Sequence, residues 1–298
     1  MQHASSLRSP WKRSIVKSSV RLAGLYLVGL SLAVLSPTAP VQAAPDTLRT
    51  VIDAPHRTEA SRARDEYRHP FETLEFFRVR PAMTVVEIWP GAGWYTEILA
   101  PYLRESGTYY AAHFSPDTEV DYFRRSLTGF EAKLAAAPEL YGEVNLVALD
   151  PDKGVLDVPD GSADRVLTFR NVHNWLRNDG EQTAFDLFFR VLKPGGILGV
   201  VEHRGNPGID RAAMLNTGYM DEETVIGLAT NAGFVLDGRS DINANLRDTK
   251  DHPKGVWTLP PNLRLGDENR ERYQAIGESD RMTLRFRKPE NGVAPVRD

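Results

Sequence analysis

The sequence predicts a doubly wound α/β fold whose sheet has seven strands and is mainly parallel. Three observations lead to this prediction. Apolar, strand-like runs alternate with helix-like segments over about 200 residues, which is typical of parallel sheets covered by helices on both faces. The apolar run Val85–Ile88 is followed by the glycine turn Gly91-Ala92-Gly93 and then by a helix-like segment. The turn Lys193-Pro194-Gly195-Gly196 separates another amphipathic helix from another apolar strand.

The first 43 residues are predicted to form a secretory signal peptide. They carry five basic residues and no acidic one, and they contain the apolar run Leu22–Leu35 and the small-residue site Val41-Gln42-Ala43. The apolar run is shorter than the roughly 20 residues of a membrane span. An uncleaved N-terminal anchor is the alternative. Both interpretations predict a folded part outside the cytoplasm, periplasmic or secreted, and cleavage would leave no stable membrane span.

The charge of the remaining chain limits its partners. The whole sequence has 36 basic and 40 acidic residues, so removing the predicted signal leaves 31 basic residues and a net charge of −9. Such an acidic protein is a poor general binder of nucleic acid or anionic membranes, and a small-molecule partner is expected. The sequence has no cysteine, which excludes a cysteine nucleophile, a thiolate metal site and disulfides.

The expected elements follow the same rhythm along the chain. Residues 46–80 are expected to form a helical segment interrupted at Pro70, and residues 81–288 the α/β domain. Residues 243–280 are polar, contain three prolines and are expected to form a long excursion before the last strand, and residues 289–298 a flexible tail. Strands are predicted at 84–89, 108–114, 144–149, 165–169, 197–202, 234–242 and 281–287, and helices at 95–104, 117–137, 181–192 and 221–232.

These landmarks occur in one characteristic order. A strand containing Glu87 precedes the glycine turn, a buried strand begins near Asp164, the turn at 193–196 follows, and Ala232-Gly233-Phe234 leads into strand six. Over about residues 84–288 the chain resembles the class I S-adenosylmethionine-dependent methyltransferase family. With its segments 67–70 and 90–95, it is more narrowly similar to predicted methyltransferases that carry secretory signals. The resemblance implies a Rossmann-like methyltransferase fold and S-adenosylmethionine as the cofactor.

The resemblance also implies roles for the residues around the glycine turn. Gly91 and Gly93 would let the backbone approach the amino acid part of the cofactor, and Glu87 would lie beside its amino group. Backbone donors that satisfy Glu87 at the strand end are the alternative. Asp150 matches the position that reaches the adenine amino group. His113 stands near the position where the family has an acidic residue for the ribose, and Asp117 is the substitute. Asn171 would help to position the cofactor.

The ends of strands four and five carry the candidate catalytic residues. Carboxyl ends of parallel strands meet at one edge of a sheet, so segments 170–175 and 202–204 are expected beside the glycine turn. His173 is the first candidate for a general base or a group that orients the acceptor, with Asn174 as its neighbour, and His203 is the second. For both histidines the alternative is a structural role, in which His173 only holds its loop and the cofactor.

Substrate contacts are expected from the N-terminal segment and from aromatic side chains near the turn. Packing within the fold is the alternative for the aromatic residues, and a solvated helix face is the alternative for the polar ones. No metal site is expected, because His69, His173, Glu202 and His203 lack the usual spacing of metal ligands. The candidate substrate-binding residues are Tyr67, Arg68, His69, Trp94, Tyr95 and Trp175.

Two functions remain open from the sequence. The first is S-adenosylmethionine-dependent methyl transfer to an unidentified small-molecule acceptor, which Glu87, Gly91, Gly93 and Asp150 favour. The alternative is an exported, non-catalytic binding protein on a methyltransferase fold. The export signal favours the second function, because S-adenosylmethionine is made in the cytoplasm, and so does His113, because it departs from the family pattern.

Overall fold

The computed structural model describes residues 47–291, so the predicted signal peptide and most of the predicted tail lie outside the described residues. The sheet has eight strands in the order β4-β3-β2-β1-β5-β6-β8-β7. All seven predicted strands are present, and the eighth, β4, is a two-residue strand antiparallel to β3. The strands are β1 (Thr84–Ile88), β2 (Thr108–His113), β3 (Val144–Asp150), β4 (Val155–Leu156), β5 (Ala163–Phe169), β6 (Leu192–His203), β7 (Val235–Ser240) and β8 (Arg281–Arg287).

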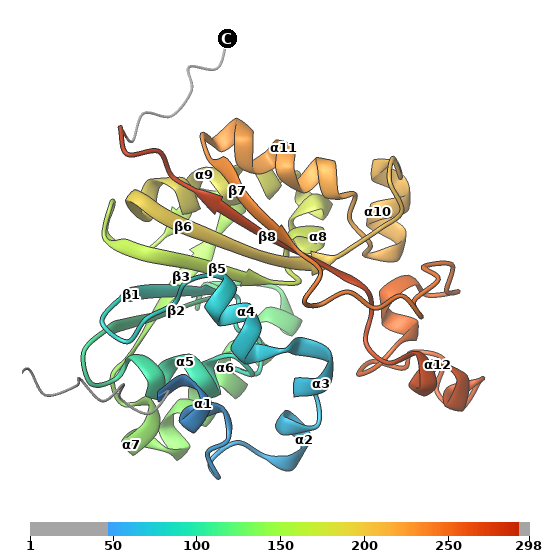
Figure 1. Ribbon diagram of the computed structural model, residues 1–298, viewed down its shortest axis with the longest axis horizontal. Helices are drawn as coiled ribbons and strands as arrows, with labels where there is room; N and C mark the ends of the chain where they lie inside the picture. The colour runs from blue at the N-terminus through green and yellow to red at the C-terminus, as the bar shows by residue number, and fades with distance from the viewer. Residues whose placement is uncertain (1–46, 292–298) are drawn as a thin grey trace, which may run out of the picture. The chain divides into compact units, whose positions relative to one another are not determined.

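Strands β1, β2, β3, β5 and β6 are parallel, and β8 runs antiparallel between β6 and β7. Helices cover both faces of the sheet, with α9 and α11 on one side and α1, α4 and α5 on the other (Figure 1). The predicted mainly parallel α/β fold is therefore confirmed. The longer helices are α5 (Thr96–Leu103), α6 (Asp121–Ala136), α9 (Glu181–Val191) and α11 (Glu222–Ala232); the shorter ones are α1 (Thr47–Ile52), α7 (Pro138–Tyr141), α8 (Val172–Trp175) and α10 (Arg211–Thr217).

The central strands are buried on both faces, and consecutive side chains enter different cores. Val86 and Val166 pack with the aromatic residues of α9, whereas Val85 and Leu167 pack with α5 and with Phe130 of α6. Successive side chains of a strand point to opposite faces, so a continuous apolar run fills both cores. This explains why the central strands read as unbroken apolar runs in the sequence.

The N-terminal segment folds as short helices with a break where Pro70 predicts one. The break lies at His69, which has a left-handed φ of 39°, and Pro70 is the first residue of the next helix. Proline suits that position because the first helical residue needs no amide donor. The helices concerned are α2 (Glu59–Arg62), α3 (Asp65–Arg68) and α4 (Pro70–Phe76).

The start of β6 differs from the prediction. The strand begins at Leu192, so residues 193–196 belong to it and do not form a separate turn before it. Ala163 pairs with Leu192 and Arg165 pairs with Ile197, so β6 contains a bulge there. Gly195 has a φ of +75°, and the bulge uses this left-handed conformation, which glycine adopts readily.

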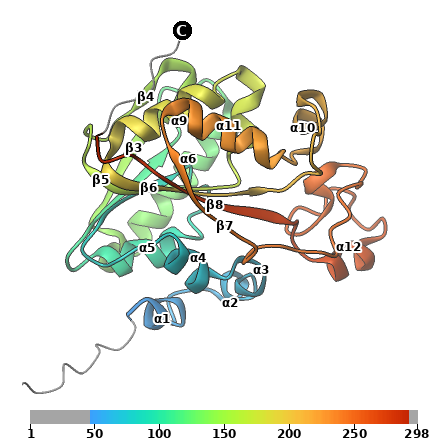
Figure 2. The ribbon, with the colours of Figure 1, turned by 45° about the horizontal axis from the view of Figure 1, so that its top comes forward.

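The predicted excursion lies between β7 and β8 and contains the short 3-10 helix η3 (Gly255–Thr258) and the helix α12 (Arg270–Ile276). It lies next to α3 in both views (Figures 1 and 2), and an ion pair of 2.5 Å joins Arg64 to Glu278. Between residues 47 and 291, none of the helices has the length and apolar character required to cross a membrane.

Candidate functional site

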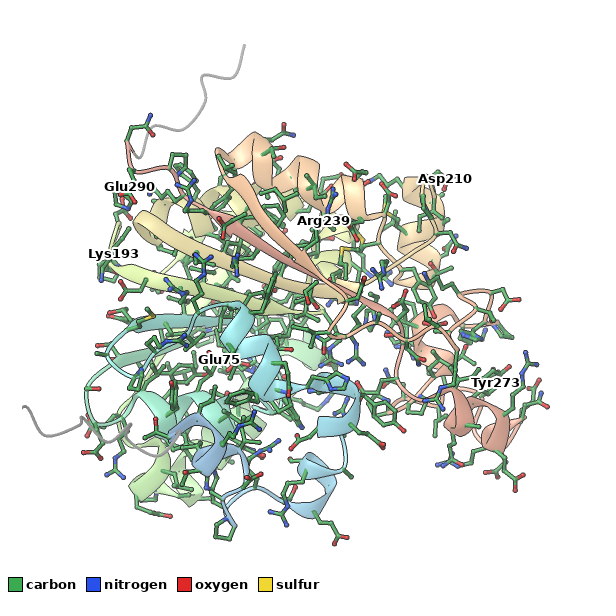
Figure 3. The ribbon with its side chains drawn as sticks, in the orientation of Figure 1. Glu75, Lys193, Asp210, Arg239, Tyr273 and Glu290 are labelled. Atoms are coloured by element: carbon green, nitrogen blue, oxygen red, sulfur yellow. The ribbon has the colours of Figure 1, made fainter. Side chains whose placement is uncertain are left out.

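Two cavities open at the carboxyl ends of the parallel strands, and they share two residues. Trp89, directly after β1, and Asn174, in α8, line both of them. Residues 193–196 lie far from this site, because Lys193 is at the opposite end of β6, beside Glu290 (Figure 3). The site therefore occupies the edge where parallel α/β sheets bind their ligands.

The first cavity has a volume of about 380 Å³ and lies beyond the ends of β1, β2 and β3. Its apolar wall consists of Trp89, Phe114, Phe123 and Trp175, whose rings pack against one another with centroids 4.0 to 5.7 Å apart. The indole Nε1 of Trp175 is buried and has no hydrogen-bond partner among the described residues. Carboxylates from Asp117, Glu119, Asp150 and Asp152 line the other side.

The second cavity, of about 310 Å³, lies between the glycine turn, α3, the end of β5 and the excursion. It is lined largely by polar groups and by aromatic rings. The lining residues include Arg64, Arg68, Glu87, Gly91, Trp94, Tyr95, Arg170, Asn171, His173, His203, Trp257 and Asn262.

Glu87 is almost fully buried in β1, with 2% of its side chain exposed. Its Oε2 atom accepts hydrogen bonds from Thr96 Oγ1, at 3.0 Å, and from the Tyr109 hydroxyl. The structure gives no such bond to Oε1 from the described residues. Burial raises the pKa of the Glu87 carboxyl to about 7, against the opposing effect of these two hydrogen bonds. The alternative of backbone donors is wrong, because two side-chain hydroxyls satisfy Oε2.

The glycine turn is built on two left-handed residues. Gly91 has a φ of +59°, and a Cβ added there would meet no atom within 4 Å. Gly93 has a φ of +78°, and a Cβ there would lie 3.0 Å from the ring of Phe130. Gly91 lines the second cavity, whereas Gly93 lets the turn pack closely on α6. Only Gly91 is therefore placed to approach a ligand.

His113 lies outside both cavities. Its Nδ1 accepts a hydrogen bond from the Phe114 amide at 2.8 Å, and its Nε2 lies 3.2 Å from the carbonyl oxygen of Gly91. Burial lowers the pKa of His113 to about 4, so the ring is neutral. The ring therefore contacts the glycine turn at Gly91. Asp117, the substitute candidate for the ribose hydroxyls, lines the first cavity.

His173 forms a buried pair with Glu202, the residue near the end of β6. Nδ1 of His173 lies 3.1 Å from Oε1 of Glu202. The Glu202 carboxylate also accepts hydrogen bonds from the amides of Val172 at 2.6 Å, His173 at 3.4 Å and His203 at 2.7 Å. A carboxylate at Nδ1 favours the tautomer with its proton on Nδ1, which leaves Nε2 of His173 as a proton acceptor. His173 lines the second cavity, so this arrangement suits a general base.

His203 lies beside this pair, with its ring centroid 5.3 Å from that of His173. Its Nδ1 atom lies 2.5 Å from Oγ of Ser279, which belongs to the excursion. Burial, followed by the charges of His173 and Arg170, holds the pKa of His203 well below its usual range. His203 is therefore neutral, as a positioning residue would be.

His173, Glu202 and His203 offer ligand atoms within 4.8 Å of one another, a spacing compatible with a metal ion. Both oxygens of Glu202 already accept hydrogen bonds, and Nδ1 of His203 has Ser279 as its partner. The hydrogen bonds account for the cluster without an ion. The expectation of no metal stays a prediction.

The N-terminal candidates divide into two groups. Arg68, Trp94 and Tyr95 line the second cavity, where the Arg68 guanidinium lies 4.5 Å from the Trp94 ring centroid. Tyr67 and His69 line neither cavity. Tyr67 packs near Gly277, and its carbonyl oxygen accepts a hydrogen bond from Arg281 at 3.0 Å.

The candidates after β3 and β5 lie at the cavities. Asp150 and Trp175 line the first cavity, and Asn171 lines the second. Asn171 donates to the carbonyl oxygen of Ile88 at 2.8 Å, so it joins the ends of β1 and β5. Asn174 lines both cavities.

Sequence reasoning missed four kinds of contribution to the site. Arg170 lies in the segment 170–175 that is predicted beside the glycine turn, but the sequence assigns it no role. Trp89 stands at the end of β1 with a φ of 42° and lines both cavities. Trp257 and Asn262 come from the excursion, where no local pattern marks them. Glu202 lies in the segment 202–204 that is predicted beside the glycine turn, but the sequence does not predict its pairing with His173.

The sequence model of the methyltransferase domain family matches residues 86–200, the part from β1 to β6. Solved structures of similar fold include a [4+2]-cyclase, SpnF, at 20% identity and a TM-score of 0.51, covering 74% of this chain and 80% of that chain. A proposed sarcosine dimethylglycine methyltransferase from Galdieria sulphuraria has 13% identity and a TM-score of 0.51, covering 78% of this chain and 90% of that one. No curated protein matches the sequence.

The structural likeness confirms that this chain has a Rossmann-like fold. The family match over residues 86–200 supports a methyltransferase that uses S-adenosylmethionine as its cofactor. The predicted enzyme class and the predicted cofactor are thereby confirmed.

Proposed function

We propose that the protein transfers a methyl group from S-adenosylmethionine to a small-molecule acceptor outside the cytoplasm. The observation that carries this proposal is the junction of two cavities at Trp89 and Asn174, with Glu87, Gly91 and His173 all lining the second cavity. One cavity suits a nucleoside and the other suits an amino acid group together with an acceptor.

The residues of the first cavity fit an adenosine. Aromatic rings of Trp89 and Phe114 offer an apolar surface for a purine, and the carboxylates of Asp117 and Asp150 can accept hydrogen bonds from hydroxyl and amino groups. Trp175 lines this cavity, and its buried Nε1 has no hydrogen-bond partner among the described residues. A buried donor without a partner is costly, so a ligand acceptor atom would stabilise it.

The residues beside the glycine turn fit the amino acid part of the cofactor. Glu87 keeps Oε1 free of the hydrogen bonds that occupy Oε2, and a carboxylate there suits an ammonium group. When bound, S-adenosylmethionine supplies an electrophilic methyl group on its sulfonium. The acceptor atom forms the new bond to the methyl carbon while the carbon–sulfur bond breaks. Nε2 of His173 takes the proton that the acceptor loses.

A test of this chemistry uses protein purified after export, methyl-labelled S-adenosylmethionine and a low-molecular-mass extract of the producing cells. The proposal expects label in a small molecule and an equal amount of S-adenosylhomocysteine. His173→Ala should transfer less label than the wild type and should bind the cofactor equally well. Binding without any transfer, in any extract fraction, would contradict methyl transfer.

The exported location rests on the sequence of residues 1–43. Mass spectrometry of the protein from a periplasmic or culture fraction is the direct test. A chain that begins after Ala43 supports the proposal, and an intact N-terminus in the cytoplasmic fraction contradicts it.

The second candidate function, an exported binding protein without catalysis, is favoured by His113. This ring is buried, neutral and engaged with Gly91, so β2 ends without a ligand-facing carboxylate of its own. The likeness to a [4+2]-cyclase also illustrates that the fold supports reactions of different kinds. The labelled transfer experiment separates the two functions.

A further inference from the structure

The second cavity is bordered by more guanidinium groups than the nearby carboxylates can neutralise. Arg64, Arg68 and Arg281 all pair with one carboxylate, that of Glu278. Arg64 Nε lies 2.5 Å from Glu278 and Arg68 Nε lies 3.4 Å from it. Among residues 47–291, the guanidinium of Arg170 has no hydrogen bond or ion pair. Three guanidiniums therefore share one carboxylate, and the fourth has no carboxylate partner among these residues.

These charges are largely removed from water. The exposed fractions of Arg68, Glu278 and Arg281 are 3%, 2% and 2%. One nitrogen of Arg64, Nη2, is buried without a partner. Burial lowers the pKa of Arg170 to about 10, and the charge of Arg281 is the next cause. Buried charges without enough partners are costly, so a bound anion would stabilise this cluster.

The backbone conformation of Arg170 also indicates a functional site. Its φ is +63°, a left-handed conformation that arginine rarely adopts, and its amide donates to the carbonyl oxygen of Val201 at 2.7 Å. Such a conformation costs a non-glycine residue energy and commonly marks functional sites. Glycine or asparagine would adopt it more easily, so the structure retains an arginine side chain here at the expense of local strain.

The other carboxylates near the second cavity do not neutralise this excess of positive charge. Glu202 lies near Arg170, but both of its oxygens accept hydrogen bonds from His173 and from backbone amides. Glu87 is the other carboxylate at this cavity, and the proposed function assigns it to the ammonium group of the cofactor. The carboxylate of the cofactor would neutralise only one of the remaining guanidiniums.

We propose that the second cavity holds its methyl acceptor by an anionic group, a carboxylate or a phosphate, bound by Arg170 together with Arg68 and Arg64. This inference rests on the proposed function, because it identifies the bound molecule as the acceptor. Arginine forms paired hydrogen bonds with both kinds of anion. The aromatic rings of Trp94, Tyr95 and Trp257 line the same cavity and suit an apolar body attached to that group.

The experiment measures anion binding with and without S-adenosylhomocysteine, which occupies the site for the cofactor carboxylate. The probes are benzoate for a carboxylate, phenyl phosphate for a phosphate ester and benzamide as the neutral match, at constant ionic strength. Fluorescence of the tryptophans at the cavity reports binding. The inference expects at least one anion to bind to the S-adenosylhomocysteine complex, and benzamide to bind at least about ten-fold more weakly.

Arg170→Asn removes the charge while suiting the left-handed backbone, so this variant should fold. It should weaken binding of the anion about ten-fold or more and leave S-adenosylhomocysteine binding unchanged, whereas Arg170→Lys should retain part of the anion affinity. Arg239→Gln, on the exposed part of β7, is the matched control and should change neither. The preferred anion decides between a carboxylate and a phosphate.

Three results would overturn the inference: no anion binds, benzamide binds as well as the more tightly bound of the two anions, or Arg170→Asn weakens S-adenosylhomocysteine binding and leaves anion binding unaffected. The last result would assign Arg170 to the cofactor carboxylate. Failure of the wild type to bind S-adenosylhomocysteine would instead refute the proposed function. Binding of anions to the protein alone would then still decide whether an anion site exists.

Discussion

Oε1 of Glu202 lies 3.1 Å from Nδ1 of His173, and both side chains are buried at the ends of neighbouring strands. The pair joins β6 to α8, and His173 lines the second cavity. It is the arrangement by which a carboxylate fixes the tautomer of a general base. The proposed general base and the stability of this edge of the sheet therefore depend on the same carboxylate.

Glu202→Gln should destabilise the fold. The carboxylate accepts four hydrogen bonds, three of them from backbone amides, and an amide side chain turns its NH₂ group towards some of those donors. We expect the free energy of unfolding in urea to fall by about 3 kcal/mol. Glu75→Gln breaks an exposed pair with Arg80 and should cost less than about 1 kcal/mol. Equal losses in the two variants would contradict the role of the Glu202 cluster.

His173→Ala should lower the rate of methyl transfer by about 10²- to 10⁴-fold, the range of general-base catalysis. Affinity for S-adenosylhomocysteine should stay within about two-fold of wild type, because the proposed function assigns the ring to the acceptor and not to the cofactor. Single-turnover kinetics and calorimetry measure the two quantities separately. An unchanged rate of turnover in this variant would show that His173 is not the general base.

Gly91→Val should abolish cofactor binding without unfolding the protein. A side chain there projects into open space, which is the space the cofactor would need. Gly208→Val is the matched control, since its φ of +77° is also left-handed and its Cβ also meets no atom within 4 Å. The two variants should lose similar stability in thermal unfolding, and only Gly91→Val should lose S-adenosylhomocysteine binding. Retained affinity in Gly91→Val would mean that the site is misplaced.

Cofactor binding should depend on pH through Glu87. Burial raises the pKa of this carboxyl to about 7, while the hydroxyls of Tyr109 and Thr96 and the charges of Lys133 and Arg68 oppose the shift. An ammonium ligand selects the ionised form, so affinity should rise about eight-fold from pH 6.0 to 7.5. Glu87→Gln should bind more weakly and show no such rise. Calorimetry at both pH values on both proteins checks this, and parallel profiles would exclude Glu87 as the titrating group.

The contribution of Glu87 to folding stability changes with pH in the opposite direction to cofactor affinity. Its folded-state pKa is about 7 against an ordinary value of 4.5, so the folded state holds the proton more tightly. Its contribution to stability is therefore fully present below about pH 4.5 and is lost as the pH rises through 7. The difference in unfolding free energy between wild type and Glu87→Gln should shift in favour of the variant between pH 5 and pH 8. A constant difference would show that the pKa is not raised.

The sequence was sufficient to predict the fold because its signals are local. Each central strand is a continuous apolar run, and a break at Pro70 follows from the geometry of proline. Strand ends on one edge of a parallel sheet also located His173 and Asn171 correctly at a cavity. These inferences needed only periodicity and the direction of the strands.

The arginine cluster depends on contacts across the chain and had no local signal. Arg64 meets Glu278 across 214 positions, and the two come together only when the excursion folds beside α3. His113 illustrates the opposite difficulty, since its place at the end of β2 suggested a ligand contact. The direction of its ring is set by the Gly91 carbonyl and the Phe114 amide, which no pattern of residues reveals.

The most direct test of the central claim is calorimetric titration of the exported protein with S-adenosylmethionine and S-adenosylhomocysteine. The structure predicts one site per chain for each ligand, with affinity lost in Gly91→Val and kept in Gly208→Val. Absence of heat from both ligands at high micromolar concentration, with the protein folded, would contradict a cofactor site at this edge of the sheet.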